Sequence, residues 1–274
     1  MIEAGTSPEQ ILSRLGIKEP ADLDIEAIAY ACGATILPQP LTGCQANIIG
    51  FGDRAIITVN SNAIPTRQRF SSGHELGHWM KDRGQSAFGC VDIQIDSEWT
   101  SNNAETRANR FASDLLLPVS MFAPLAKERP MTLDTVRDLA SMFRMSRTAT
   151  AIRLVNYGSF PAMLVYYVQG QRKWFLRPSN DIPSSLWPSE RPDACSLAAG
   201  LLAGKSDTAT GDVRADRWFE RDMSEKYCIR ESCFRTGADS IIVILWWEDE
   251  QQLIDIAEEE ERRASRRSDQ REEY

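Results

Sequence analysis

The sequence predicts an α+β protein, and three observations lead to this fold class. Short apolar runs between residues 34 and 59 are separated by proline and glycine, which is typical of strands joined by turns. Apolar residues recur at helical spacing in several stretches between residues 65 and 154. From Phe160 onward the apolar runs become short again, which favours a second strand-rich region.

Two short helices and a hairpin are expected in the first 60 residues. Ser7-Pro8-Glu9-Gln10 is a capping-box sequence with proline at the first helical position, so a helix should begin there. Asp24 can cap a second helix, which Gly33 would end. A turn at Gly50-Phe51-Gly52-Asp53 predicts a hairpin between two of the three expected strands, which are residues 34–37, 45–50 and 55–59.

The next region should contain two longer helices. Pro65 opens the first, which ends in polar residues 81–84. Asn102 or Asn103 can cap the second, and Pro118 stops it. Residues 85–101 lack helical periodicity and are expected to form a loop or an edge strand, with alternating apolar side chains at Val91, Ile93 and Ile95.

The remainder of the chain should form a helical pair, a strand-rich domain and a charged tail. Leu133, Val136, Leu139, Ala140 and Phe143 share one helical face, and after a break at 144–146 a second helix should carry Ala149, Ile152 and Leu154. This pair resembles a helix-turn-helix. Beyond it we expect a helix at 196–203, a loop at 204–211 and strands at 162–169, 172–177, 214–219, 227–235 and 240–247. The predicted domains are therefore 1–120, 121–158 and 159–250, with a tail at 251–274 that is a solvated helix end or disordered.

His74, Glu75 and His78 form the sequence H-E-x-x-H and include both histidines of the chain. On a helix this spacing places the two imidazoles one turn apart on the same face, as half of a zinc site requires. Glu75 projects beside them, where it could hold a water molecule and take its proton. The alternative is a pair of surface histidines next to a capping glutamate.

A catalytic zinc ion needs three protein ligands, so the third must be Asp, Glu or Cys. Glu105 shares a helical face with Ala108 and Ala112, whose small side chains would allow a close approach to the first helix. Glu105 could instead be an acid that suits the first turn of its helix. Asn109, one turn after Glu105, could orient a ligand, or could be an ordinary helix-surface asparagine.

Two longer motifs carry a resemblance to a known family. R-Q-R-F-x-x-x-H-E-L-G-H from Arg67 to His78, and E-x-x-A-N-x-F-A-x-x-L-L-x-P from Glu105 to Pro118, resemble the ImmA/IrrE metallopeptidases. The resemblance implies a gluzincin-like, zinc-dependent endopeptidase with a three-domain layout: a zincin-like peptidase domain, a helix-turn-helix-like middle domain and a GAF-like α+β domain.

The resemblance also implies the reaction and the roles of the residues. The substrate would be a helix-turn-helix (XRE-type) transcriptional repressor, whose cleavage derepresses stress-response or mobile-element genes. His74, His78 and Glu105 would bind Zn²⁺, Glu75 would be the general base, and Mn²⁺ could also support activity in vitro. The alternative function is a zinc-bearing regulator without proteolytic activity, against which the intact Glu75 argues.

Other partners follow from charge and aromatic content. The second helix of the pair would carry or adjoin three basic residues, Arg144, Arg147 and Arg153. In a DNA-binding helix-turn-helix, the second helix is the one that enters the major groove. Asp134, Asp138 and the net charge of −8 oppose DNA binding, and docking of the repressor is the other use of this pair. A small molecule could bind among the tryptophans of the C-terminal region, although strand aromatics are more often core: Trp174, Trp187, Trp218, Trp246 and Trp247.

Composition predicts a soluble cytoplasmic protein without a membrane partner. The chain begins without a basic region before an apolar run, and no stretch approaches membrane-spanning length. Six dispersed cysteines without a C-x-x-C pair fit reduced thiols. One of them, Cys44, precedes the expected hairpin, so its thiolate could occupy the open zinc position until oxidation releases it. The alternative is that Cys44 packs as a small hydrophobe.

Overall fold

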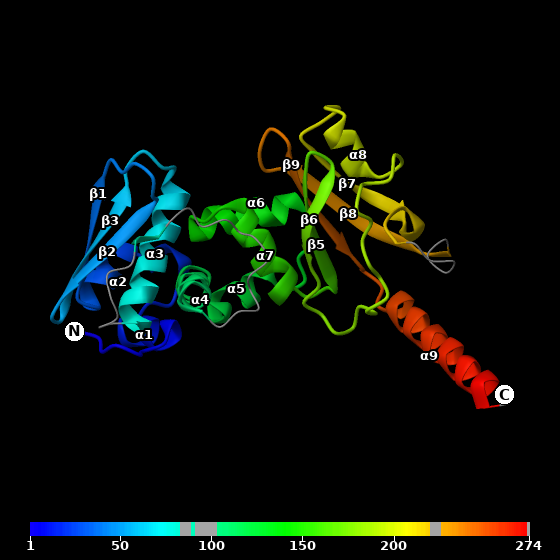
Figure 1. The fold of residues 1–274 in the computed structure, drawn as a ribbon, viewed down its shortest axis with the longest axis horizontal. Coiled ribbons are helices and arrows are strands. Elements are labelled where there is room, and N and C mark those ends of the chain that lie inside the picture. The colour runs from blue at the N-terminus through cyan, green and yellow to red at the C-terminus, as the bar shows by residue number, and fades with distance from the viewer. Residues whose placement is uncertain (83–88, 91–102, 220–225, 273–274) are drawn as a thin grey trace. The chain divides into compact units, whose positions relative to one another are not determined.

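The computed structural model describes residues 1–82, 89–90, 103–219 and 226–272. They form two compact units, and each unit consists of two segments of the chain (Figure 1). The N-terminal unit combines residues 1–125 with 138–150, and the C-terminal unit combines residues 126–137 with 151–274. The division into four sequence ranges stays a prediction.

The N-terminal unit begins with the two predicted capped helices. α1 (Pro8–Arg14) has a complete capping box, because Ser7 and Gln10 each accept a hydrogen bond from the other's backbone N–H. After a short 3₁₀ turn η1 (Pro20–Asp22), α2 (Ile25–Ala31) is capped by the Asp24 carboxylate. Gly33 then adopts a φ of 83°, which favours glycine and ends the helix as predicted.

A four-stranded sheet follows, in the order β1-β3-β2-β4. β2 (Ala46–Phe51) and β3 (Arg54–Asn60) form the predicted antiparallel hairpin, and β1 (Ala34–Gln39) pairs with β3 in parallel. β4 (Gly89–Cys90) pairs with the start of β2. The expected alternation of Val91, Ile93 and Ile95 lies outside the described residues.

One helix fills the centre of this unit. α3 (Pro65–Lys81) packs between the sheet and α4 (Ala104–Leu116), and all ten residues from Ser71 to Met80 are buried (Figure 1). The indole of Trp79 lies against β2 at Gly50 and donates a hydrogen bond to the carbonyl of Cys32. Of the two predicted caps of α4, the residue that accepts from its first turn is Asn103.

Three more helices continue from α4. α6 (Leu133–Phe143) and α7 (Arg147–Tyr157) form the predicted pair, and the predicted face of α6 is buried. α5 (Val119–Ala126) was not predicted, because it is short and contains Pro124, which normally breaks a helix. Burial of Phe122 and Ala126 stabilises it nevertheless.

The C-terminal unit is built on a five-stranded antiparallel sheet in the order β6-β5-β9-β8-β7. α8 (Leu197–Leu202) contacts β7, β8 and β9, and its buried side chains join the core of this unit. Trp218 and Trp247 belong to that core, so both serve packing. A ligand in this domain stays a prediction. The strands are β5 (Ala162–Val168), β6 (Gln171–Leu176), β7 (Thr208–Arg214), β8 (Cys228–Arg235) and β9 (Ser240–Trp246).

The loop expected at 204–211 is confirmed only as far as residue 207, because a strand begins at Thr208, and the strand expected at 214–219 is wrong. β7 ends at Arg214, and a 3₁₀ turn η2 (Ala215–Arg217) follows. Thr208 to Arg214 form an edge strand because each residue pairs with a residue of β8, from Phe234 to Cys228. That pairing is a long-range interaction, and a Ser/Thr/Gly-rich composition does not reveal it.

The charged tail is a helix, which was one of the two expected states. α9 (Gln251–Glu272) anchors its first turns through Leu253 and Ile256, which are buried in the core of the C-terminal unit. Further along, Glu258 and Arg262 form an exposed ion pair. None of the helices within the described residues combines the length and apolarity that a membrane-spanning segment needs. Cys44, Cys195, Cys228 and Cys233 are free thiols.

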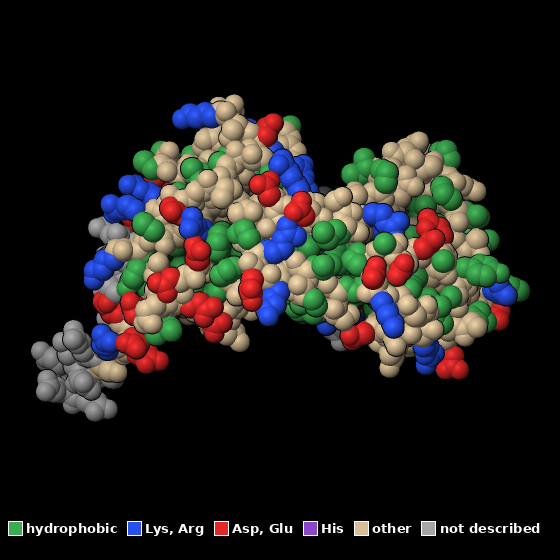
Figure 2. Space-filling view, turned by 180° about the vertical axis from the view of Figure 1, so that it is seen from behind, with side chains coloured by type: hydrophobic (Ala, Val, Ile, Leu, Met, Phe, Trp, Pro, Cys, Tyr) green, Lys and Arg blue, Asp and Glu red, His purple; other side chains and the backbone are tan. Residues whose placement is uncertain are grey.

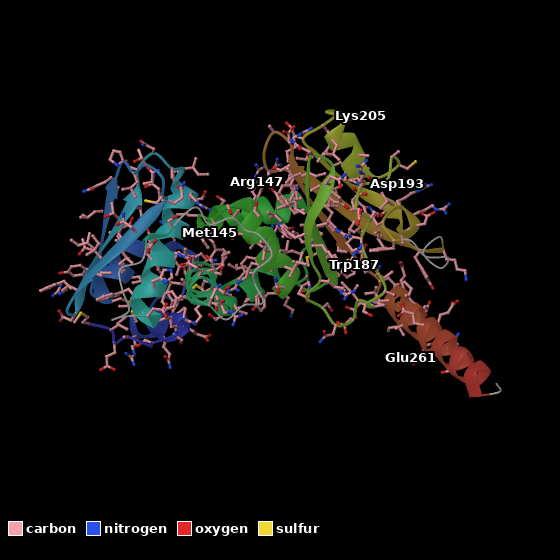
Figure 3. The ribbon with its side chains drawn as sticks, in the orientation of Figure 1. Met145, Arg147, Trp187, Asp193, Lys205 and Glu261 are labelled. Atoms are coloured by element: carbon pink, nitrogen blue, oxygen red, sulfur yellow. The ribbon has the colours of Figure 1, made fainter. Side chains whose placement is uncertain are left out.

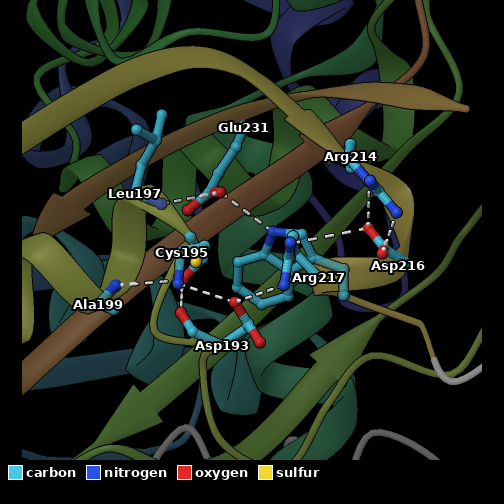
Figure 4. A network of polar contacts seen from close by, with 10 residues as sticks. Asp193, Cys195, Leu197, Ala199, Arg214, Asp216, Arg217 and Glu231 are labelled. Carbon is cyan, nitrogen blue, oxygen red and sulfur yellow. Dashed lines mark hydrogen bonds and ion pairs between the residues drawn. The ribbon is translucent and has the colours of Figure 1, made fainter. Parts of the chain in front are cut away.

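A buried carboxylate ties α8 to the sheet of the C-terminal unit. Glu231 of β8 is fully buried and accepts hydrogen bonds from the backbone N–H groups of Leu197 and Ala198 and from the indole of Trp218, at 3.2, 2.7 and 3.0 Å (Figure 4). Burial raises the pKa of Glu231 above its ordinary value of 4.5, although the three donors oppose the shift.

Because its folded-state pKa is raised, Glu231 contributes stability that is complete below pH 4.5 and is lost as the pH rises through the folded-state value. We expect the unfolding free energy of wild type, measured relative to Glu231→Gln, to fall with rising pH within this window, by up to about 1.4 kcal/mol per pH unit. Denaturant unfolding of wild type and Glu231→Gln at a series of pH values measures this pH dependence. Glu190→Gln, an exposed position in the same unit, is the control and should reproduce the wild-type slope; a Glu231→Gln curve parallel to wild type would contradict the prediction.

Candidate metal centre

The predicted histidines and glutamate lie on the buried part of α3. His74, Glu75 and His78 are 0, 1 and 2% exposed, so the surface-pair alternative is wrong. The ring centroids of the two histidines are 4.7 Å apart, and their Nε2 atoms are 3.1 Å apart. Burying three polar side chains within two helical turns costs folding free energy unless each of them has a partner. Such a cluster of buried polar groups is typical of a functional site.

Small residues on both helices allow α4 to approach α3. A Cβ atom on Gly77 would lie only 3.0 Å from the backbone of Ala108, and one on Gly73 would lie 3.4 Å from the Cβ of Ala112. Both alanines are completely buried. The close approach expected from the alanines of α4 is therefore present, and glycines of α3 provide the other half of it.

This approach brings Glu105 to the histidines. Its two carboxylate oxygens lie 3.2 Å from Nε2 of His74 and 3.4 Å from Nε2 of His78. The ligand atoms of these three residues all lie within 4.8 Å of one another, the arrangement in which a metal ion could be held. Glu105 is half exposed, so solvent reaches the cluster from its side.

Contacts within the cluster shift the pKa values of Glu105 and His78. Hydrogen bonds with His74 and His78 hold the pKa of the Glu105 carboxyl well below its usual range. Burial by itself would lower the pKa of His78, but contacts with Glu105, Glu75 and Asp82 outweigh burial and raise it. Negative charge therefore surrounds the imidazoles, as suits a cation site.

Asn109 lies where it can orient a histidine. Its Oδ1 accepts a hydrogen bond from Nδ1 of His74 at 2.9 Å. Because an amide oxygen only accepts, Nδ1 of His74 carries a proton, so Nε2 is the nitrogen of this ring that can bind a metal ion.

Sequence reasoning missed a second pair of residues next to the histidines. Asp82, directly after α3, is buried, and its Oδ2 lies 3.4 Å from Nδ1 of His78. Arg107 of α4 donates a hydrogen bond of 2.6 Å to the other oxygen of Asp82. The spacing of four residues between His78 and Asp82 is the signal in the sequence, although the polar run 81–84 by itself predicts only the end of the helix.

Cys44 is half-buried in the connection between β1 and β2. Among the described residues, the potential metal cluster contains His74, His78 and Glu105 and does not include this thiol. The proposed thiol switch stays a prediction.

Comparison with known proteins identifies this region. Residues 34–155 match the IrrE N-terminal-like domain family, and the match includes α3, α4 and the complete cluster. This part of the chain is an IrrE N-terminal-like domain. Outside residues 34–155, α1 and α2 complete the N-terminal unit, while the C-terminal sheet follows the domain in sequence.

Two similar proteins place the IrrE N-terminal-like domain in a wider context. The chain is 24% identical over 116 residues to the radiation response metalloprotease IrrE of Deinococcus radiodurans, across 42% of this chain and 35% of that protein. The match thus spans about a third of the relative's length. A solved Mycobacterium tuberculosis transcriptional regulator has a similar fold, with a TM-score of 0.56 and 12% identity over 87% of this chain and 85% of the other.

Removal of Glu105 tests its membership of the metal centre. Glu105→Ala should lower zinc affinity by about 10-fold or more, because a lost ligand costs at least as much as a lost supporting contact. Competition with a chromophoric chelator measures the affinity. Arg110→Ala, an exposed truncation on the same helix, is the control. Unchanged affinity in Glu105→Ala would remove this residue from the site.

Proposed function

We propose that this chain is a zinc-dependent endopeptidase that cleaves a helix-turn-helix transcriptional repressor and so derepresses stress-response or mobile-element genes. The observation that carries the proposal is the convergence of His74, His78 and Glu105 within 4.8 Å, with Glu75 buried beside them. The match to the IrrE N-terminal-like domain family and the likeness to a protein named a metalloprotease support the reaction class.

The residues fit a zinc ion. Two imidazole nitrogens and a carboxylate are a common donor set in catalytic zinc sites and leave a further coordination position open. Nδ1 of His74 is engaged by Asn109 and Nδ1 of His78 faces Asp82, so both Nε2 atoms are directed to the same point as the Glu105 carboxylate. Mn²⁺ could replace Zn²⁺ in vitro, because it accepts the same ligand types.

The mechanism assigns one role to each residue. When bound, the zinc ion supplies a lowered water pKa, near 7, and polarises the scissile carbonyl. Glu75 accepts the proton of the attacking water and delivers it to the leaving amine. Asn109 holds the Nδ1 proton of His74, so that Nε2 is the nitrogen that would coordinate the metal.

The finer fold assignments belong to the same proposal. We assign a zincin-like fold to the peptidase domain, a helix-turn-helix-like fold to α6 and α7, and a GAF-like fold to the C-terminal sheet. The α6–α7 pair then serves to dock the repressor, and the C-terminal domain could take a small-molecule signal.

Direct DNA binding by α6 and α7 is the other use of this pair, and the contacts of its arginines weigh against it. Arg144 donates to the carbonyl of Leu23, while Arg153 is buried and lies over the ring of Tyr157. Arg147 is exposed at the start of α7 (Figure 3). Figure 2 shows acidic and basic side chains interspersed on the visible face of the described residues, without a continuous basic stripe. Affinity for nucleic acid depends on such a stripe.

The alternative is a zinc-bearing regulator without proteolysis, which the fold similarity to a transcriptional regulator favours. One experiment separates the two functions. Purified full-length chain, loaded with zinc or manganese, is mixed with helix-turn-helix repressors encoded near its own gene, and the products are analysed by mass spectrometry. Discrete fragments that disappear when a chelator removes the metal support the peptidase. Bound metal without cleavage of any repressor supports the regulator.

A thiol switch at Cys44 has its own test. Basal cleavage by wild type and by Cys44→Ser is measured with and without mild peroxide. A switch requires that Cys44→Ser be active from the outset and unaffected by peroxide, because no thiolate then blocks the open zinc position. Equal rates in all four conditions would leave Cys44 as a packing residue.

A further inference from the structure

We propose that Asp82 and Arg107 form a positioning pair that fixes the His78 imidazole for metal binding, an inference that rests on the proposed metal site. Asp82 is 4% exposed and stands between the two partners. One carboxylate oxygen lies 3.4 Å from Nδ1 of His78, and the other accepts the 2.6 Å hydrogen bond from Arg107.

Asp82 lies where a carboxylate can fix the orientation and the tautomer of the His78 ring. Nε2 of His78 faces His74 and Glu105, so Nδ1 is the remaining polar atom of the ring. A carboxylate beside Nδ1 favours the tautomer with the proton on Nδ1 and limits rotation of the ring. Nε2 is then left with its lone pair directed at the site.

Arg107 keeps this carboxylate in place. A buried carboxylate is costly unless it is paired, and the Arg107 guanidinium supplies the pairing charge. Arg107 comes from α4, two residues after Glu105 and two before Asn109. α4 therefore provides Glu105 to the cluster, Asn109 to His74 and, through Arg107 and Asp82, support for His78.

A purely structural role would look different in solution. If the pair only joined the end of α3 to α4, its loss would lower stability but would leave the ring of His78 and the zinc affinity unchanged. A positioning role predicts effects on both the ring and the affinity.

Zinc affinity is measured by chelator competition for the full-length wild type, Asp82→Ala, Arg107→Gln and the double variant. We expect Asp82→Ala to weaken binding by about 10- to 100-fold and Arg107→Gln by less. The double variant should bind no more weakly than Asp82→Ala, because Arg107 acts through Asp82. The control is Arg110→Gln, an exposed charge removal on α4. Wild-type affinity in Asp82→Ala, even with a lowered unfolding midpoint, would overturn the proposal.

The ring is observed directly in metal-free protein. Because the chain has only two histidines, ¹⁵N NMR of the imidazoles resolves both. Asp82→Ala should change the tautomer balance of His78 far more than that of His74, and Asn109→Ala should do the reverse. If Asp82→Ala fails to fold, Asp82→Asn is measured in its place and should also shift the His78 signals. Unchanged His78 signals would overturn the positioning role of Asp82 and Arg107, even if the wild type bound no zinc. Failure of this proposal is therefore distinguishable from failure of the proposed function.

Discussion

Glu75→Gln is expected to lower the rate of repressor cleavage by about 100- to 10,000-fold, the range that a positioned general base contributes. Glutamine has the same size as glutamate, so it fits the buried position, but its amide cannot take a proton from water. Zinc affinity should stay close to that of wild type, because Glu75 is not one of the three residues whose ligand atoms converge. Single-turnover cleavage at saturating zinc measures the effect.

The control for this prediction is Glu9→Gln, at an exposed position of α1, which should cleave like wild type. Cleavage at the wild-type rate by Glu75→Gln would exclude Glu75 as the base. Loss of zinc together with loss of activity would instead indicate that Glu75 supports the metal rather than the proton transfer.

Gly77→Val should weaken both the fold and the metal centre. The Cβ of the new side chain would lie 3.0 Å from the backbone of Ala108, and its two methyl groups need further space. Backbone atoms cannot rotate away, so α4 must move, at a cost of about 1–3 kcal/mol in unfolding free energy. Since Glu105 and Asn109 both belong to α4, we also expect zinc affinity to fall by about 10-fold or more.

Gly73→Ala is the matched control on the same helix. Its Cβ would approach the flexible end of Leu116 at 3.0 Å, which can adjust, and alanine is favoured over glycine within helices by about 1 kcal/mol. We therefore expect stability and zinc affinity near those of wild type for Gly73→Ala. Denaturant unfolding measures the stability of both variants, and chelator competition measures their zinc affinity. If Gly73→Ala lost as much stability and zinc affinity as Gly77→Val, the close packing of α4 against Gly77 would not explain the effect.

Short-range patterns in the sequence were enough to predict α3 and α4 and the capping residues of α1, α2 and α4. Histidines four residues apart lie on one face of any helix, and Asn103, Ser7 and Asp24 cap through hydrogen bonds to residues only two or three positions away. The β2–β3 hairpin is likewise a local structure, set by its glycine turn. The count of two histidines required a different third ligand, and the spacing of Glu105, Ala108 and Ala112 indicated where it would come from.

Only the tertiary structure decided which distant residues support these local elements. Asp82 meets Arg107 because α3 and α4 pack closely, and no pattern within either helix encodes that contact. Residues 208–214 form β7 because they pair with β8. Glu231 can remain buried because two backbone N–H groups of α8 and the indole of Trp218 donate hydrogen bonds to its carboxylate. Local periodicity reports which face of a segment is apolar, whereas strand pairing and the partners of buried charges depend on residues far along the chain.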